Sequence, residues 1–219
     1  MKLKAAIFDV DGTLVDSNGA HAEAWRDALL EFGFDKPVSE IRPLIGMGGD
    51  KVIARLTGLD SESDRGKQLS AWRARRFREA YLHTIRPFPK ARELFEAMRD
   101  DGVKRALASS GKRDELKPLL ELAGIDGLID HFVCADDAEE SKPDADLFLV
   151  ALDRLKCERD VVRAVGDTPY DVEASRRAGI EIIAVRCGGW DDQHLQGACL
   201  IVDDPAAVLR HYLQNLRPE

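Results

Sequence analysis

Two aspartates separated by one residue, Asp9 and Asp11, are the first candidates for chemistry, because they directly follow a short apolar segment. That segment, residues 3–8, has the pattern of a buried strand. Residues two apart on an extended backbone point to the same side, so the two carboxylates would lie together, and Gly12 would let the chain turn at once. Neighbouring carboxylates repel each other unless they share a proton or a metal ion, and Mg²⁺ favours carboxylate oxygens. For so short a pattern, a turn capped by its own aspartates is the plainer alternative.

Polar residues also follow later apolar segments. Residues 103–108 are followed by Ser109 and Ser110, and hydroxyls with free amides at a helix N-terminus can bind phosphate. Ser109 could equally cap the following helix. Lys142 and Pro143 precede a helical pattern, where a solvated lysine and a proline in the first helical turn are the ordinary interpretation.

The segment at residues 161–165 is followed by Gly166 and Asp167. Residues 168–171 read TPYD, which fits a capping box with proline in the first turn and needs no catalytic explanation. Asp167 does need one, because a carboxylate beside a buried strand end should be paired.

The composition is that of a soluble globular protein, with 219 residues, 44% hydrophobic and 33% charged. A formal net charge of −8 argues against a nucleic acid or an anionic membrane as partner. No apolar segment approaches the roughly 20 residues of a membrane-spanning helix. The chain enters its first strand directly, which predicts no signal peptide and a cytoplasmic protein. The four cysteines form no C-x-x-C pair, and three have apolar surroundings, which predicts buried, reduced thiols.

Helical and strand-like patterns alternate from residue 91 onward. Strands are expected at residues 103–108, 131–135, 161–165, 180–185 and 199–202, and helices at 91–100, 115–123, 145–155, 171–178 and 205–216. This alternation predicts an α/β fold with a doubly wound parallel sheet, whose ligands bind beyond the carboxyl ends of the strands. Residues 17–85 show helical spacing at 18–34, 51–59 and 62–83 and no strand pattern. We therefore expect a helical domain over residues 17–85, inserted into a core of residues 1–16 and 86–219.

Together these segments resemble the four motifs of the haloacid dehalogenase (HAD) superfamily of phosphotransferases. Residues 9–17 read DVDGTLVDS, which is similar to the first motif, and Ser109 stands where the second places a phosphoryl-binding hydroxyl. Lys142-Pro143 resembles the third motif, and residues 166–171, GDTPYD, resemble the fourth. The motifs occur in order over the whole core. The resemblance implies a Rossmann-like HAD core with an inserted helical cap, in the branch of phosphoglycolate phosphatases and β-phosphoglucomutases.

The resemblance implies phosphoryl transfer through an aspartyl-phosphate. Asp9 would be the nucleophile. Asp11, with a pKa raised by desolvation and by its neighbour, would protonate the leaving oxygen and then activate water. Lys142 would neutralise the nucleophile and the transferring group. Dehalogenases of the family carry no acid/base aspartate at this place, so Asp11 indicates phosphate esters.

The same resemblance implies a cofactor and substrate contacts. Mg²⁺ would be held by Asp9, the backbone carbonyl of Asp11 and Asp167, with Asp171 as a ligand or behind the ligands. The substrate contacts implied are Ser109, Ser110, Thr13 and Gly48.

The insert resembles the mobile cap of the family, which selects the substrate. Members similar to β-phosphoglucomutase carry an arginine after the cap glycine to grip a second phosphate. Here residues 46–50 read GMGGD, so that grip would be absent or moved to Lys51 or Arg55, and the loop looks more like that of phosphoglycolate-type phosphatases. A simple helix-to-helix turn is the alternative. The arginines of residues 73–78 are expected on a solvated helix face.

The predicted function is thus a magnesium-dependent phosphatase acting on a small, soluble phosphate monoester, as a monomer or weak homodimer. The runner-up is a phosphosugar mutase of the same fold. A phosphate-binding module without catalysis is the third alternative.

Overall fold

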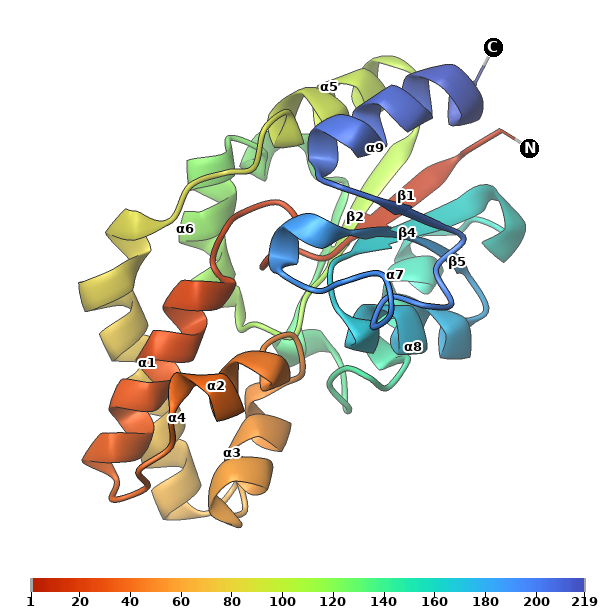
Figure 1. Cartoon of the computed structure of the whole chain (residues 1–219). Helices are drawn as coiled ribbons and strands as arrows, with labels where there is room; N and C mark the ends of the chain where they lie inside the picture. Colours follow the sequence, from red (N-terminus) through yellow and green to blue (C-terminus); the bar gives the residue numbers. More distant parts are fainter. Residues whose placement is uncertain (1, 219) are drawn as a thin grey trace.

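The computed structural model describes residues 2–218 and contains a parallel six-stranded sheet between two layers of helices (Figure 1). The strands are β1 (Ala5–Phe8), β2 (Lys104–Ala108), β3 (His131–Val133), β4 (Val162–Gly166), β5 (Glu181–Val185) and β6 (Leu200–Val202). Their order in the sheet is β3-β2-β1-β4-β5-β6, so β1 is central and pairs with β2 and β4. The predicted α/β fold with a parallel sheet is confirmed.

Helices cover both faces of the sheet, because alternate residues of each strand point to opposite sides. The helices α5 (Ala91–Asp100), α6 (Arg113–Ala123) and α9 (Pro205–His211) pack on the face that carries Ala6 and Phe8 of β1. The helices α7 (Asp146–Leu155) and α8 (Pro169–Ala178) pack on the face that carries Ala5 and Ile7. Because β1 is buried on both faces, its sequence is a continuous apolar run, which made the strand recognisable.

Residues 18–84, which lie between β1 and α5 in the chain, are called the cap region below. It contains α1 (Asn18–Glu31), α2 (Val38–Ile41), α3 (Gly49–Thr57) and α4 (Asp64–Arg76), which lie beside the sheet and not on its faces (Figure 1). Its apolar side chains form a cluster of their own around Trp25, Ile53 and Leu69. The division of the chain into two domains stays a prediction.

Two long helices end earlier than expected. The sequence predicts one helix over residues 62–83, but α4 ends at Arg76 and a π-helical turn follows over Phe77–Tyr81. Likewise α9 ends at His211 and continues as a π-helical turn over Tyr212–Leu216. In a π-helical turn each backbone N–H bonds to the carbonyl five residues earlier and not four. The helical spacing of apolar residues in the sequence does not reveal this change.

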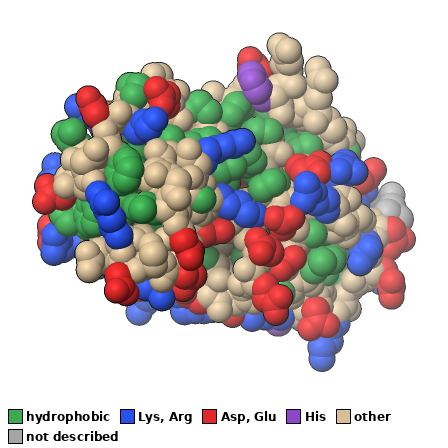
Figure 2. Space-filling view, turned by 90° about the horizontal axis from the view of Figure 1, so that it is seen from below, with side chains coloured by type: hydrophobic (Ala, Val, Ile, Leu, Met, Phe, Trp, Pro, Cys, Tyr) green, Lys and Arg blue, Asp and Glu red, His purple; other side chains and the backbone are tan. Residues whose placement is uncertain are grey.

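Figure 2 shows acidic and basic side chains mixed over one face of the molecule, with apolar side chains between them. All four cysteines are free, but only Cys134 is buried, and Cys199 is exposed. Cys157 and Cys187 are half-buried, so the expectation of three buried thiols is wrong. None of the helices within residues 2–218 has the length and apolar composition of a membrane span.

Candidate active site

The carboxyl ends of β2, β1 and β4 lie next to one another, and each is followed by a predicted site residue. Asp9 comes directly after β1, Ser109 after β2 and Asp167 after β4. Because β1 pairs in parallel with both neighbours, these three groups meet at one edge of the sheet. This edge is where ligands of open parallel sheets bind.

Lys142 lies at the centre of this edge, not in solvent. Its Nζ is 2.6 Å from Asp9 Oδ1 and 2.7 Å from Asp171 Oδ1, and its side chain is 1% exposed. Burial lowers the pKa of Lys142, but the attraction of Asp171 and Asp9 outweighs this and raises the pKa, so the lysine is charged. Pro143 is not in the first turn of α7, as the sequence had suggested, because that helix begins at Asp146.

Asp167 is held by two donors from the segment that follows β1. Thr13 Oγ1 donates to Asp167 Oδ1 at 2.9 Å, and Asn18 Nδ2 donates to Asp167 Oδ2 at 2.8 Å. Thr13 was expected to contact the substrate, but its hydroxyl is committed to orienting this carboxylate. Gly12 has φ +77°, and a Cβ there would collide with Asn18 and Asp167, so this turn requires glycine. Burial and then the charge of Asp171 raise the pKa of Asp167 to about 7.

The acidic group formed by Asp9, Asp167 and Asp171 suits a divalent cation. One oxygen from each carboxylate lies within 4.8 Å of the others, and all three residues are buried. Three carboxylates face the single positive charge of Lys142. Burial raises the pKa of Asp9 well above its ordinary value; Lys142 opposes this shift, and the nearby aspartates add to it. Hard oxygen donors with uncompensated negative charge are what Mg²⁺ binds.

Asp171 is held both by Lys142 and by the N-terminal cap of its own helix. Oδ1 pairs with Lys142, and Oδ2 accepts bonds from Thr168 Oγ1 at 2.6 Å and Thr168 N at 3.0 Å. The latter bonds complete the predicted capping box of α8. Asp171 therefore holds Lys142 in place, and one of its oxygens also lies close enough to Asp9 and Asp167 to share a cation with them.

Asp11 lies beside the acidic group and faces the cap region. Its Oδ1 accepts a bond from Ser17 Oγ at 2.5 Å and lies 2.8 Å from His21 Nε2. The ring of His21 stacks on Phe77, with centroids 4.1 Å apart and planes 4° apart. Burial raises the pKa of Asp11, but His21, Ser17 and Arg73 together outweigh burial and lower it. The raised pKa expected from the sequence is therefore wrong for this state, because the cap region supplies partners that the motif does not reveal.

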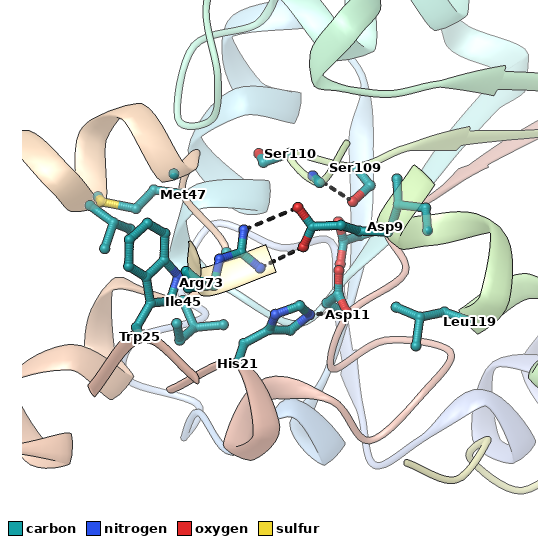
Figure 3. A pocket seen from close by; sticks show the side chains of 16 residues that line it. Asp9, Asp11, His21, Trp25, Ile45, Met47, Arg73, Ser109, Ser110 and Leu119 are labelled. Carbon is teal, nitrogen blue, oxygen red and sulfur yellow. Dashed lines mark hydrogen bonds and ion pairs between the residues drawn. The ribbon is translucent and has the colours of Figure 1, made fainter. Parts of the chain in front are cut away.

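A small cavity of about 60 Å³ separates the sheet edge from the cap region. Figure 3 shows Asp9, Asp11 and Ser109 on its core side and Trp25 and Met47 on its cap side. Typical ligand pockets hold about 300–1,000 Å³. The described cavity is therefore much smaller than a typical ligand pocket.

Both serines after β2 line this cavity. Ser109 Oγ accepts a bond from Gly111 N at 3.1 Å, and Ser110 Oγ is buried without a hydrogen-bond partner among residues 2–218. A free hydroxyl near the N-terminus of α6 suits a phosphate oxygen. The placement agrees with the phosphate-site interpretation of these two residues.

The glycine loop of the cap region closes the cavity through Gly46, Met47 and Gly49. Gly48, the residue expected to contact substrate, is absent from the described lining, and a Cβ there would collide with Ser141 of the core. Gly48 instead lies at a close approach between the cap loop and the segment that carries Lys142.

The two cap cations considered for a second phosphate do not line this cavity. Lys51 Nζ donates to Ser141 O and to Asp144 Oδ2, each at 2.6 Å, and Arg55 is exposed. Of the alternatives left open by the sequence, the absence of a second-phosphate grip fits the structure best.

Arg73 corrects another expectation, because it is buried and not on a solvated face. Its guanidinium forms a bidentate ion pair with Glu115 of α6. Leu69 and Phe77, four residues before and after it, are both fully buried. Residues four apart share a helix face, so this spacing could have placed Arg73 inside.

Three further residues of α1 that the sequence reasoning did not assign to the site are part of it: Asn18, His21 and Trp25. Their spacing of three and seven residues puts them on one helix face directly after the first motif. That spacing was the available signal.

Comparison with known proteins gives consistent matches. The sequence model of the haloacid dehalogenase-like hydrolases matches residues 6–185. A phosphoglycolate phosphatase from Nitrosospira multiformis is 31% identical over 193 residues, which cover 86% of this chain and 85% of that protein. The solved structure of a hydrolase from Pseudomonas syringae is similar with a TM-score of 0.89 and 30% identity, covering 97% of this chain and 99% of that one. A Bacteroides vulgatus structure provisionally assigned as a β-phosphoglucomutase has a TM-score of 0.85 and 25% identity, covering 97% of this chain and 88% of that one.

Proposed function

This chain belongs to the haloacid dehalogenase-like hydrolase family, and we propose that it is a magnesium-dependent phosphatase that hydrolyses a small phosphate monoester through an aspartyl-phosphate. The observation that carries the proposal is the buried Lys142, which joins Asp9 to Asp171 at the sheet edge opposite a cavity lined by Ser109 and Ser110. A lysine so placed offsets the repulsion between a carboxylate nucleophile and a phosphate dianion.

In the first step Asp9 attacks phosphorus, and the bond from phosphorus to the leaving alcohol breaks. The charged Lys142 stabilises the negative charge on the nucleophile and on the transferring group. The hydroxyls of Ser109 and Ser110, which line the cavity, would bind phosphoryl oxygens.

Asp11 acts as the general acid and then as the general base. It protonates the departing oxygen in the first step and takes a proton from the attacking water in the second, which releases phosphate and regenerates Asp9. The pKa of Asp11 is low in this state, but a bound phosphate dianion adds negative charge beside it and raises the pKa. Ser17 and His21 fix the orientation of the carboxylate.

The residues that would hold Mg²⁺ are Asp9 and Asp167, together with the backbone carbonyl of Asp11. When bound, the ion would screen the nucleophile from the phosphate charge and orient the phosphoryl group. Asp171 would act by holding Lys142, and Thr13 and Asn18 by orienting Asp167.

A panel of phosphate monoesters, including p-nitrophenyl phosphate, tests the proposal. Hydrolysis is expected with Mg²⁺, should be lost with EDTA and should return when Mg²⁺ is added again. Calcium should inhibit, because its larger coordination shell misplaces the reacting groups. Full activity in metal-free buffer would contradict the metal-dependent mechanism.

The mutase alternative is supported by the likeness to the Bacteroides vulgatus structure. A mutase must hold a second phosphate, and the placement of Lys51 and Arg55 outside the described cavity lining counts against it. Turnover that depends on a bisphosphate activator would favour the mutase over the phosphatase.

A further inference from the structure

A buried ion pair crosses from the cap region to the core at the wall of the cavity. Arg73 Nη1 lies 2.5 Å from Glu115 Oε2, and Arg73 Nη2 lies 3.3 Å from Glu115 Oε1. Arg73 is 8% exposed and Glu115 is 4% exposed. The guanidinium carbon also lies 4.9 Å from the ring centre of Trp25. The pair is therefore fixed in the wall of the same cavity that Asp9 and Ser109 line.

The charges around the cavity leave no free cation for a second anionic group. Among the described residues that line the cavity, Arg73 is the one arginine or lysine, and Glu115 already neutralises it. His21 is committed to Asp11, and Asp9 adds a further negative charge. A carboxylate or phosphate placed beside Arg73 would also face Glu115, and like charges repel strongly where little water is present.

The same cavity can satisfy neutral polar groups. Arg73 Nε is buried and has no hydrogen-bond partner in the described part of the chain, so it can donate to a hydroxyl. The Glu115 carboxylate has lone pairs left to accept from another hydroxyl. Trp25, Ile45 and Leu116 supply apolar surface for C–H groups. Figure 3 shows Trp25 and Ile45 together on the cap side, with Arg73 beside them.

We propose that the Arg73–Glu115 pair makes the enzyme selective for phosphate monoesters whose leaving group is a neutral, hydroxyl-bearing alcohol. Leaving groups that carry a second negative charge are rejected, because Glu115 cancels the one cation among the described residues that line the cavity. This inference rests on the proposed phosphatase function, since it concerns which ester is hydrolysed.

Matched substrate pairs test the selectivity. Glycerol phosphate and phosphoglycerate differ in a hydroxymethyl group that is replaced by a carboxylate, and so do sorbitol phosphate and phosphogluconate. Values of kcat/KM are measured with Mg²⁺ for both pairs, with p-nitrophenyl phosphate as the reference for core chemistry. The wild type should prefer the neutral member of each pair by at least about tenfold.

Variants then assign this preference to the pair. Glu115→Gln keeps the shape of the side chain but no longer neutralises Arg73. The ratio of kcat/KM for the carboxylate-bearing substrate to kcat/KM for the neutral one should therefore rise by about tenfold or more. In the double variant Arg73→Gln, Glu115→Gln the wall is neutral again, and the ratio should return toward the wild-type value. The matched control is Asp114→Asn, which breaks the exposed 3.0 Å pair of Asp114 with Arg78 across the same boundary and should leave the ratio unchanged.

The outcomes separate the two proposals. A wild type that hydrolyses the anionic members as well as the neutral ones overturns the selectivity inference, even if the variants fail to fold. An equal loss on both members of a pair in folded Glu115→Gln shows a structural role only and also overturns it. A similar shift in Asp114→Asn would contradict it as well. Failure to hydrolyse any ester, p-nitrophenyl phosphate included, instead overturns the proposed phosphatase function.

Discussion

Replacing Lys142 by methionine tests whether this lysine neutralises the buried acidic group. The change keeps an unbranched side chain of similar length but removes the charge that pairs with Asp9 and Asp171 at 2.6 and 2.7 Å. Removing one partner of a buried ion pair typically costs about 3–5 kcal/mol of unfolding free energy. The cost should be smaller at about pH 5 than at about pH 8, because the raised pKa of Asp9 lets that carboxylate take up a proton as the pH falls. Loss of one group that stabilises transition-state charge lowers kcat by about 10²–10³-fold.

The assay is urea unfolding in EDTA at both pH values, together with hydrolysis of p-nitrophenyl phosphate in Mg²⁺. The control is Lys112→Met, which removes an exposed lysine near the same edge of the sheet and should change stability by less than about 0.5 kcal/mol. An equal stability loss for Lys142→Met at both pH values would show that packing, not charge, is the cause. Wild-type activity in this variant would refute the catalytic assignment.

Three further predictions concern Asp167, Asp11 and Gly48. The pKa of Asp167 is raised from 3.8 to about 7, so the folded protein holds a proton that the unfolded chain releases. The thermal midpoint of unfolding in EDTA should therefore fall as the pH rises from about 4 to about 7, and added Mg²⁺ should restore it. If the midpoint of Asp167→Asn falls as steeply with pH, this carboxylate is not the cause. Asp11→Asn should slow single-turnover cleavage of an alkyl phosphate by about 10²-fold or more. Cleavage of p-nitrophenyl phosphate should slow much less, because p-nitrophenolate leaves without a proton. Equal losses on both substrates would exclude Asp11 as the general acid. Gly48→Val should lower kcat/KM for small and large esters alike, because its side chain would push against Ser141, the neighbour of Lys142. A loss confined to large esters would instead show that the loop contacts only the substrate.

The core could be predicted from the sequence because its signals are local. Strands buried on both faces are apolar throughout, and the polar residue that ends each strand is directly visible. Parallel pairing then brings Asp9, Ser109 and Asp167 together without further information. Lys142 was assigned only by resemblance, since a lysine before a proline has no local signal for burial.

The cap side of the site could not be predicted in the same way. The pKa of Asp11 depends on His21 and Arg73, which come from two helices whose packing on the core the sequence does not specify. Arg73 was misjudged because three exposed arginines follow it, although its spacing from Leu69 marked the buried face. Gly48 was taken for a substrate contact because a glycine that serves a close backbone approach looks the same in a sequence.

The central claim is that Asp9 becomes covalently phosphorylated during turnover. The most direct measurement is peptide mass mapping of enzyme that has been quenched in acid during steady-state hydrolysis with Mg²⁺. The account predicts a phosphoryl group on Asp9 in the wild type, and neither modification nor turnover in Asp9→Asn, which is nearly isosteric but cannot attack phosphorus. Turnover at the wild-type rate by Asp9→Asn, or a phosphoryl group on another residue, would contradict it.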